Sequence, residues 1–147
     1  MIKQVLTTSL LSLGAAYVCQ FIQSLGESQY LNEFLKGNLI TLLVALLAIN
    51  SATMGIVLTK IRDLIDKNGT GSDSFQATKK EMLLSIKEQI ALIVSAVFLL
   101  TIGGSSFISN SSEIQTGYWV LITGVFIYAM IVLYDTAKSV IIIIDYE

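Results

Sequence analysis

The side chains that could do chemistry in this chain are few, and their spacing favours packing and binding over catalysis. The sequence holds no histidine and a single cysteine, Cys19, which rules out a Ser–His–Asp triad and an internal disulfide. With one thiol and no imidazole, a zinc, haem or iron–sulfur site is not expected. The paired acids Asp63 and Asp66 alternate with basic residues, a pattern typical of a solvated helix face. The sequence therefore predicts a protein that is not an enzyme and that holds no metal or cofactor.

An amide side chain, Asn50, lies close to the middle of a long apolar stretch that covers residues 37–59. An amide without a partner in hydrocarbon costs free energy, so we expect Asn50 to find a hydrogen-bond partner. Two arrangements would provide one: a hydrogen bond to another helix of the same protomer, or a ring of Asn50 side chains around the axis of an oligomer. The sequence leaves both arrangements open.

Small residues beside Asn50 and in a later apolar stretch favour close contact between helices. Small side chains four residues apart, such as Ser51 and Gly55, let two helix backbones approach closely in a membrane. Gly117 and Gly124 are seven residues apart, which puts both on one face of a helix. We predict that the following residues form helix-packing contacts or surround an oligomer axis: Asn50, Ser51, Gly55, Gly117 and Gly124.

The elements that must position these side chains follow from the spacing of the charged residues. Charged residues make up only 14% of the 147 residues, against about 25% in a typical soluble domain. Four stretches of 23, 23, 24 and 21 residues carry no charge; they begin after Lys3, Lys36, Glu88 and Glu113. A helix of about 20 apolar residues crosses the hydrocarbon core of a bilayer, which is roughly 30 Å thick. Helices of a soluble bundle would need polar faces, and none of the four stretches has one.

We therefore predict an all-α, integral membrane four-helix protomer that forms a single membrane domain over residues 1–147. The predicted spans cover about 5–22, 37–59, 90–107 and 117–134. The first span follows a start typical of a signal peptide, but its apolar run is too long for cleavage. Of the nine lysines and arginines, only Lys36 falls on the side of the bilayer opposite the termini and the central connection. By the positive-inside rule, both termini face the cytoplasm, and the protein lies in a bacterial inner membrane.

The connection between the second and third spans, residues 60–89, is predicted to extend beyond the bilayer as a cytoplasmic αα-hairpin. Helical spacing of apolar residues continues past the second span until Asn68-Gly69-Thr70-Gly71 breaks it. Phe75 stands in this Gly/Ser-rich tip, where an aromatic ring has little of its own chain to pack against. The alternative is that the extension packs only on itself. We predict a partner-binding surface made of Lys60, Arg62, Lys67, Phe75, Lys79 and Lys80.

Two further segments allow two interpretations each. In the outer segment, residues 23–36, four apolar side chains share one helical face, which predicts a short amphipathic helix on the outer surface or a loop with aromatic anchors. These side chains are Tyr30, Leu31, Phe34 and Leu35. The cytoplasmic tail, residues 135–147, contains a β-branched run at 140–144. This run is a helix extension, the simpler interpretation, or a strand that adds to the sheet of a partner.

One segment carries a family resemblance: Asn50-Ser51-Ala52-Thr53-Met54-Gly55-Ile56-Val57-Leu58-Thr59-Lys60-Ile61-Arg62-Asp63-Leu64, together with Lys87-Glu88-Gln89-Ile90-Ala91 ahead of the third span. With four spans and a charged central loop, the whole chain resembles in layout the KwaA family, the membrane subunit of the Kiwa anti-phage defence system. The resemblance implies a sensor that detects phage attachment or DNA injection at the membrane. It also implies a homo-oligomer, a tetramer, that holds a cytoplasmic DNA-binding partner subunit. No residue-level site transfers from the family.

Charge and polarity bear on the competing functions. The net charge of −2 argues against direct nucleic-acid binding, so contact with DNA would belong to the partner. The predicted spans hold no ionisable Asp, Glu, Lys, Arg or His, which argues against a pump or a proton-coupled carrier. A small homo-oligomeric ion channel or holin-like pore, gated by an apolar constriction, remains an alternative. A membrane assembly or immunity protein that acts through its spans alone is another.

Overall fold

The protein is a bundle of four long helices in the computed structural model, which describes residues 2–68, 76–105, 108 and 111–144. The helices are α1 (Ile2–Leu25), α2 (Tyr30–Asn68), α3 (Gln76–Gly103) and α5 (Ser112–Ile144). No strand occurs among the described residues. The predicted all-α fold is confirmed.

Each helix contains a stretch that is long and apolar enough to cross a bilayer. These stretches are Lys3–Leu25, Tyr30–Asp63, Lys79–Gly103 and Ser112–Lys138. Large apolar side chains are exposed along the outside of the bundle; Leu10 is 69% exposed and Phe98 is 65% exposed. In water such a surface would be a severe aggregation hazard, whereas in lipid it has no cost. The length and composition of the helices and their apolar exterior fit a multi-pass membrane protein.

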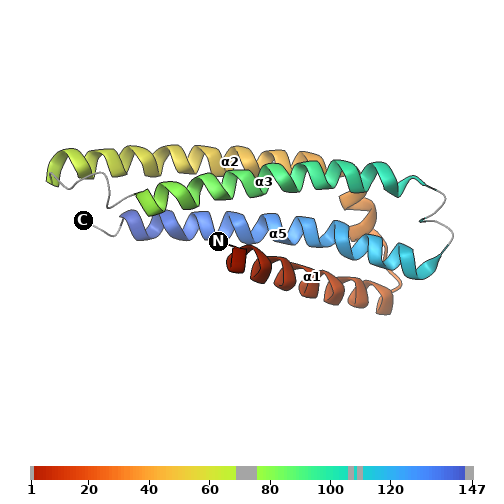
Figure 1. Cartoon of the computed structure of the whole chain (residues 1–147). Helices are drawn as coiled ribbons and strands as arrows, with labels where there is room; N and C mark the ends of the chain where they lie inside the picture. Colours follow the sequence, from red (N-terminus) through yellow and green to blue (C-terminus); the bar gives the residue numbers. More distant parts are fainter. Residues whose placement is uncertain (1, 69–75, 106–107, 109–110, 145–147) are drawn as a thin grey trace.

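The helix α5 lies at the centre of the arrangement and contacts each of the other three (Figure 1). The helices α2 and α3 pack against each other and against α5, while α1 lies along α5 on the other side. Gly124 of α5 makes room for this contact, because a Cβ atom there would lie 3.1 Å from Leu13 Cδ2 of α1. The predicted packing role of Gly124 is therefore met within the protomer.

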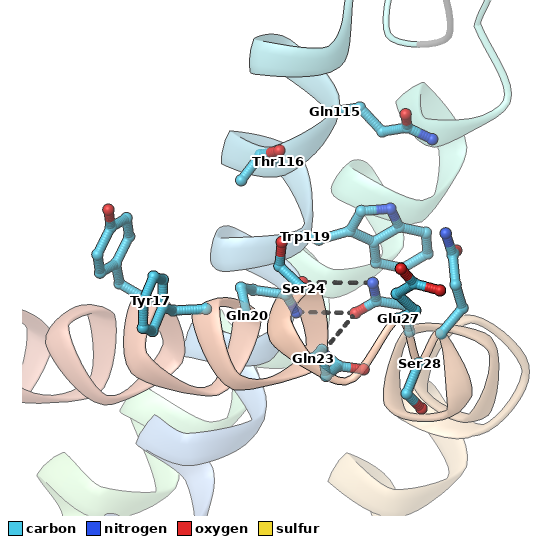
Figure 2. Close-up of a pocket in the computed structure, with 12 residues that line it drawn as sticks. Tyr17, Gln20, Gln23, Ser24, Glu27, Ser28, Gln115, Thr116 and Trp119 are labelled. Atoms are coloured by element: carbon cyan, nitrogen blue, oxygen red, sulfur yellow. Dashed lines mark hydrogen bonds between the residues drawn. The ribbon is translucent and has the colours of Figure 1, made fainter.

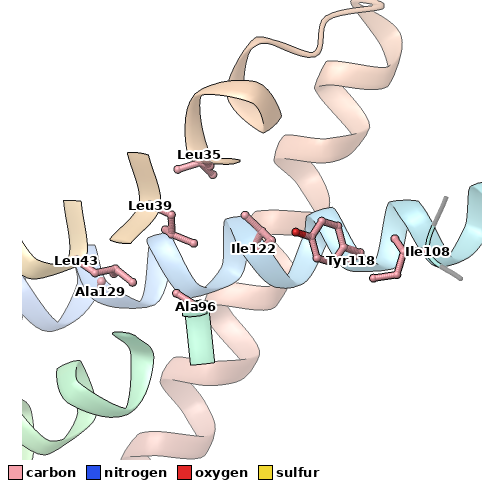
Figure 3. Close-up of a cluster of buried hydrophobic side chains, with 8 residues drawn as sticks. All are labelled: Leu35, Leu39, Leu43, Ala96, Ile108, Tyr118, Ile122 and Ala129. Carbon is pink, nitrogen blue, oxygen red and sulfur yellow. The ribbon is translucent and has the colours of Figure 1, made fainter. Parts of the chain in front are cut away.

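The larger of two buried apolar clusters joins α2, α3 and α5 (Figure 3). Its members are Leu35, Leu39, Leu43, Ala96, Ile108, Tyr118, Ile122 and Ala129. The three leucines recur every four residues, which places them on one face of α2 towards α5. This cluster fixes the rotation of α2 about its own axis and so decides which of its polar side chains point inward.

The smaller cluster lies where α2 ends and α3 begins. Its members are Met54, Val57, Ile61 and Met82, with Ile65, Ile86 and Val140 packed against them. Val140 comes from the tail, because α5 continues to Ile144. The interpretation of the tail as a helix extension is therefore confirmed, and the strand interpretation is wrong.

The outer segment differs from both of its predicted forms. Residues 30–36 are neither a separate surface helix nor a loop, because α2 begins at Tyr30 and continues without interruption. Leu35 is fully buried in the larger cluster, while the exposed rings of Tyr30 and Phe34 stack with centroids 6.2 Å apart. Burial of Leu35 against α5 extends the helix of the second predicted span in the N-terminal direction.

The two ends of the bundle have different characters. The charged end is formed by the last turns of α2 and the first turns of α3, and the predicted hairpin tip between them falls on residues 69–75, outside the described residues. The pocket end is formed by the turn between α1 and α2 and by the first turns of α5. The two ends lie at opposite extremes of α2 (Figure 1).

Candidate functional site

A network of amide side chains ties three helices together at the pocket end. Gln20 of α1 donates from Nε2 to Asn32 Oδ1 of α2 at 2.7 Å and to Thr123 Oγ1 of α5 at 3.0 Å. Asn32 Nδ2 donates back to Gln20 Oε1 at 3.3 Å, and Gln23 Nε2 also donates to Asn32 Oδ1 at 3.3 Å. Gln20, Asn32 and Thr123 are 8%, 7% and 1% exposed. Burial shields these bonds from water, so the network holds the turn between α1 and α2 firmly against α5.

Beside this network lies a cavity of about 480 Å³ that is open to the outside (Figure 2). Its wall contains three aromatic side chains, Tyr17, Phe21 and Trp119. Five amides also line it: Gln20, Gln23, Gln29, Asn32 and Gln115. Glu27, a carboxylate, is the one charged residue among the described residues that line the cavity. A volume of this size is within the usual range of ligand pockets, about 300–1,000 Å³.

The backbone at Glu27 is in an unfavourable conformation that presents its side chain to this cavity. Its φ is 48°, in the left-handed region where a residue with a Cβ is disfavoured by about 1–2 kcal/mol. Two backbone hydrogen bonds close the end of α1 around it, from Ser28 N to Gln23 O at 3.0 Å and from Glu27 N to Ser24 O at 3.3 Å. This pairing is a Schellman motif, in which glycine usually takes the position of Glu27. A glutamate therefore holds a position that glycine usually takes, and it lines the cavity.

Trp119, in the aromatic wall of the cavity, is supported by a contact with a neighbouring aromatic ring. Trp119 packs edge-on against Tyr118, with ring centroids 5.0 Å apart and an interplanar angle of 66°. Tyr118 is buried against the end of α3, where Gly103 leaves no Cβ in the path of its ring. The first turns of α5 therefore hold Trp119 in a defined position.

A second set of buried amides lies deeper in the bundle. Asn50 of α2 is 0% exposed and Gln89 of α3 is 2% exposed, and neither has a hydrogen-bond partner among the described protein groups. No described group supplies the hydrogen bond that is predicted within the protomer. Asn50 is enclosed by the helices of its own protomer, and its predicted place at an oligomer axis stays a prediction.

The other predicted small residues lie on outer faces of the bundle. A Cβ added at Gly55 or Gly117 would meet nothing within 4 Å, and Ser51 is exposed on the same helix as Gly55. These positions are open to a neighbouring molecule, whereas Gly124 is occupied by α1. Their predicted role at an oligomer axis stays a prediction.

The predicted partner-binding residues gather at the charged end as far as the structure describes them. Arg62, Lys79 and Lys80 are exposed, and Lys60 is half-buried. The side chains of Lys67 and Phe75 lie outside the described part of the chain. Ile61 and Met82 of the smaller cluster bring the two helices together here. Acidic side chains are interspersed, so the surface is mixed in charge: Asp63, Asp66 and Glu81 are also exposed.

Next to this end, polar side chains join α3 to α5. The Tyr128 hydroxyl donates a hydrogen bond to the Glu88 carboxylate, and Ser85 Oγ lies 3.3 Å from Thr136 Oγ1. Glu88 was placed just outside the third predicted span, and helix α3 carries it into contact with α5. These bonds tie the smaller cluster to the central helix.

Sequence reasoning missed the residues of the pocket end. Gln20 and Asn32 stand at the ends of apolar stretches, where polar residues are expected on any membrane helix, so their type alone gave no signal. Glu27, which follows Gly26, also gave no signal in the sequence that it would line a cavity. No protein-family model, curated protein or solved structure matches this chain.

Proposed function

We propose that this chain is a membrane-embedded sensor and anchor subunit of an anti-phage defence complex, like the KwaA family that its layout resembles. In this proposal the pocket end receives a signal at the outer surface of a bacterial inner membrane. The charged end holds a cytoplasmic partner, and the partner makes the contact with DNA. The chain itself contributes no catalysis, no cofactor and no direct nucleic-acid contact.

The observation that carries the proposal is the continuity of α2. This helix runs from Tyr30 to Asn68 without a break, with Asn32 in the buried amide network and Ile61 in the smaller cluster. At 1.5 Å per residue these two side chains are about 44 Å apart along one rigid helix. A shift of α2 at the cavity is therefore transmitted to the charged end, which is the physical basis of sensing across a membrane.

The central helix α5 supplies a second connection between the same two places. Thr123 and Trp119 belong to the pocket end, and Val140 packs against the smaller cluster. Since α2 and α5 contact each other between these points through the larger cluster, we expect the two helices to move together. A ligand that changes the position of Trp119 would act on both helices together.

The length of α2 supports an anchoring surface outside the bilayer. Its 39 residues span about 58 Å, which is about 28 Å more than the hydrocarbon core requires. Part of this excess, residues 30–36, lies at the outer end. The predicted positive-inside orientation puts the part beyond the predicted second span, residues 60–68 or about 14 Å, in the cytoplasm as an αα-hairpin with α3. Its exposed charges would select a partner through complementary charge, and the smaller cluster would keep it rigid.

The outward face of α2 supports assembly of several copies. Small residues at Ala48, Ser51, Ala52 and Gly55 are all exposed on this helix. Small side chains allow close helix contact in lipid, where van der Waals packing drives association. We propose that this face forms the contact of a homo-oligomer, a tetramer, which would place several charged ends side by side for one partner assembly.

The experiment is a phage-plating assay in a bacterium that expresses the chain together with a cytoplasmic protein that co-purifies with it in detergent. Charge reversal at the charged end, Arg62→Glu with Lys80→Glu, should release the partner during detergent purification and abolish protection. Lys36→Glu reverses an exposed charge at the other end of the same helix and is the matched control. Full protection by the double variant, with no partner bound, would disprove the anchoring role.

The unpartnered amides Asn50 and Gln89 favour a second candidate, a small ion channel or holin-like pore. These amides are closed to solvent in this structure, so they would line a path for water or ions only after the helices around them separate. A planar bilayer recording should then show conductance that changes in Asn50→Leu. An electrically silent protein at every membrane potential would remove this candidate.

A further inference from the structure

We propose that the cavity at the pocket end binds a primary ammonium group. The source is an aminophospholipid headgroup of the phosphatidylethanolamine type or a free small diamine, and the two sources share the chemistry that the cavity recognises. The inference rests on the proposed sensing function only for the claim that occupancy of this cavity is the signal. The binding itself is argued from the lining alone.

The charge of the lining favours a cation. Glu27 is the one acidic side chain among the described residues around the cavity, and no lysine or arginine is found among them. Its carboxylate points to the side of the cavity where Trp119 lies (Figure 2). An anionic ligand would be repelled by this carboxylate, whereas an ammonium ion would pair with it.

The aromatic lining favours the same ligand. Trp119, Tyr17 and Phe21 offer π-faces and edges to a small cation and to the methylene groups next to it. A cation over the face of a tryptophan is attracted by the ring quadrupole, and the attraction grows when water is excluded. A neutral polyol would gain from the amides of the wall but not from this charge.

The hydrogen-bonding capacity of the wall selects a primary ammonium over a quaternary one. Asn32 Oδ1 already accepts from both Gln20 and Gln23, so it is saturated. Gln23 Oε1 is buried beside the cavity with no donor among the described residues. Gln23 Oε1 is closed off from the cavity, so the acceptors open to a ligand are the Glu27 carboxylate and the exposed amides of Gln29 and Gln115. Such acceptors suit a group with three N–H donors, and a quaternary ammonium has none.

The backbone at Glu27 adds an independent reason to expect a ligand. The left-handed conformation at this turn is held by a glutamate and not by a glycine. Strained conformations of this kind are kept where surrounding structure and function require them. Here the turn places Glu27 in the lining of the cavity.

The chain supplies its own reporter for a direct test. Trp119 is the single tryptophan, and it lines the cavity, so its fluorescence reports on occupancy. Protein reconstituted in phosphatidylcholine–phosphatidylglycerol vesicles would be titrated with ethanolamine and with putrescine, and in parallel with tetramethylammonium. We expect a saturable change of emission with the primary amines and binding of tetramethylammonium that is weaker by about tenfold or more.

Three variants separate loss of charge from loss of fold. Glu27→Gln removes the charge and keeps the strained backbone, and Glu27→Gly removes the charge and relieves the strain. Both should weaken amine binding by about tenfold or more, although Glu27→Gly is the more stable protein. Glu113→Gln neutralises an exposed acid of the same end that is not among the lining residues, and it should bind like the parent.

A second arm distinguishes the lipid from the free amine. Native mass spectrometry of protein taken from vesicles that contain phosphatidylethanolamine should show a retained lipid in the parent and in Glu113→Gln but not in Glu27→Gln. Retention with no response to free amines assigns the lipid source, and the converse assigns the soluble source. No response in either arm, or equal binding by Glu27→Gln, overturns the proposal.

The outcome of this test is separable from the sensing proposal. If amines bind and Glu27→Gln abolishes the binding but leaves phage protection intact, the ligand site stands and its role as the signal falls. If no amine binds while reversal of the charged end still abolishes protection, the anchoring role stands and the ligand site falls.

Discussion

Replacement of Asn50 by alanine should stabilise this protein, although it removes a fully buried side chain from the middle of the bundle. The amide of Asn50 is 0% exposed and makes no hydrogen bond to any described protein group. Burial of an amide without a compensating bond costs about 1–3 kcal/mol in mutational data. Alanine removes this cost and keeps a good helix former in α2.

The magnitude follows from two opposing terms. The truncation removes about the volume of one water molecule, ~30 Å³. At about 24 cal/mol per Å³ the remaining cavity costs roughly 0.7 kcal/mol. Subtracting this from the relief of the unpartnered amide leaves a net gain of about 1 kcal/mol in the free energy of unfolding. For a chain of this size that gain raises Tm by about 3 °C.

Thermal unfolding in detergent, followed by circular dichroism, would measure the shift. Gln20→Ala is the matched control, because Gln20 is also a buried amide but takes part in three hydrogen bonds of the network. Interhelical hydrogen bonds in membranes are worth about 0.6 kcal/mol each, so this control should lose about 2 kcal/mol. A loss of stability of 1 kcal/mol or more in Asn50→Ala would refute the reasoning, because it would mean that the amide has a partner in the native assembly.

Three further changes test the packing. Glu27→Gly should raise the unfolding free energy by about 1 kcal/mol in chemical unfolding, since glycine adopts the left-handed conformation without a steric cost, while Glu27→Gln should not change it. Gly124→Leu should cost about 1–3 kcal/mol because it forces α1 away from α5, whereas Gly117→Leu faces open space and should be neutral. Gly103→Ala should displace the ring of Tyr118 and blue-shift or broaden the emission of the tryptophan beside it; unchanged emission would contradict the bracing of the cavity wall.

The sequence by itself determined the four helices. Four charge-free stretches of at least 21 residues and the absence of proline leave the backbone no arrangement but helices in an apolar solvent, because every N–H and C=O must be paired within its own segment. Backbone pairing within a segment is a local requirement, so each helix can be predicted from its own sequence without knowing which helices pack against it. The tail lies outside the predicted spans, so this reasoning did not apply to it, and the helix extension was only the simpler of two interpretations.

Only the tertiary structure decided what the helices place together. Gln20 and Thr123 are 103 positions apart in the chain, and nothing in either segment announces that they share a hydrogen bond. The apolar stretches have no polar face that would fix the rotation of each helix about its axis. Packing therefore decides which side chains point inward. Burial of Leu35 in the larger cluster, for example, holds the first turns of α2 in the bundle. For the same reason the sequence could show that Asn50 needs a partner but not that it lies enclosed with none among the described residues. The spacing of apolar residues along the sequence describes one helix at a time. A cavity between helices depends on how several helices are rotated relative to one another.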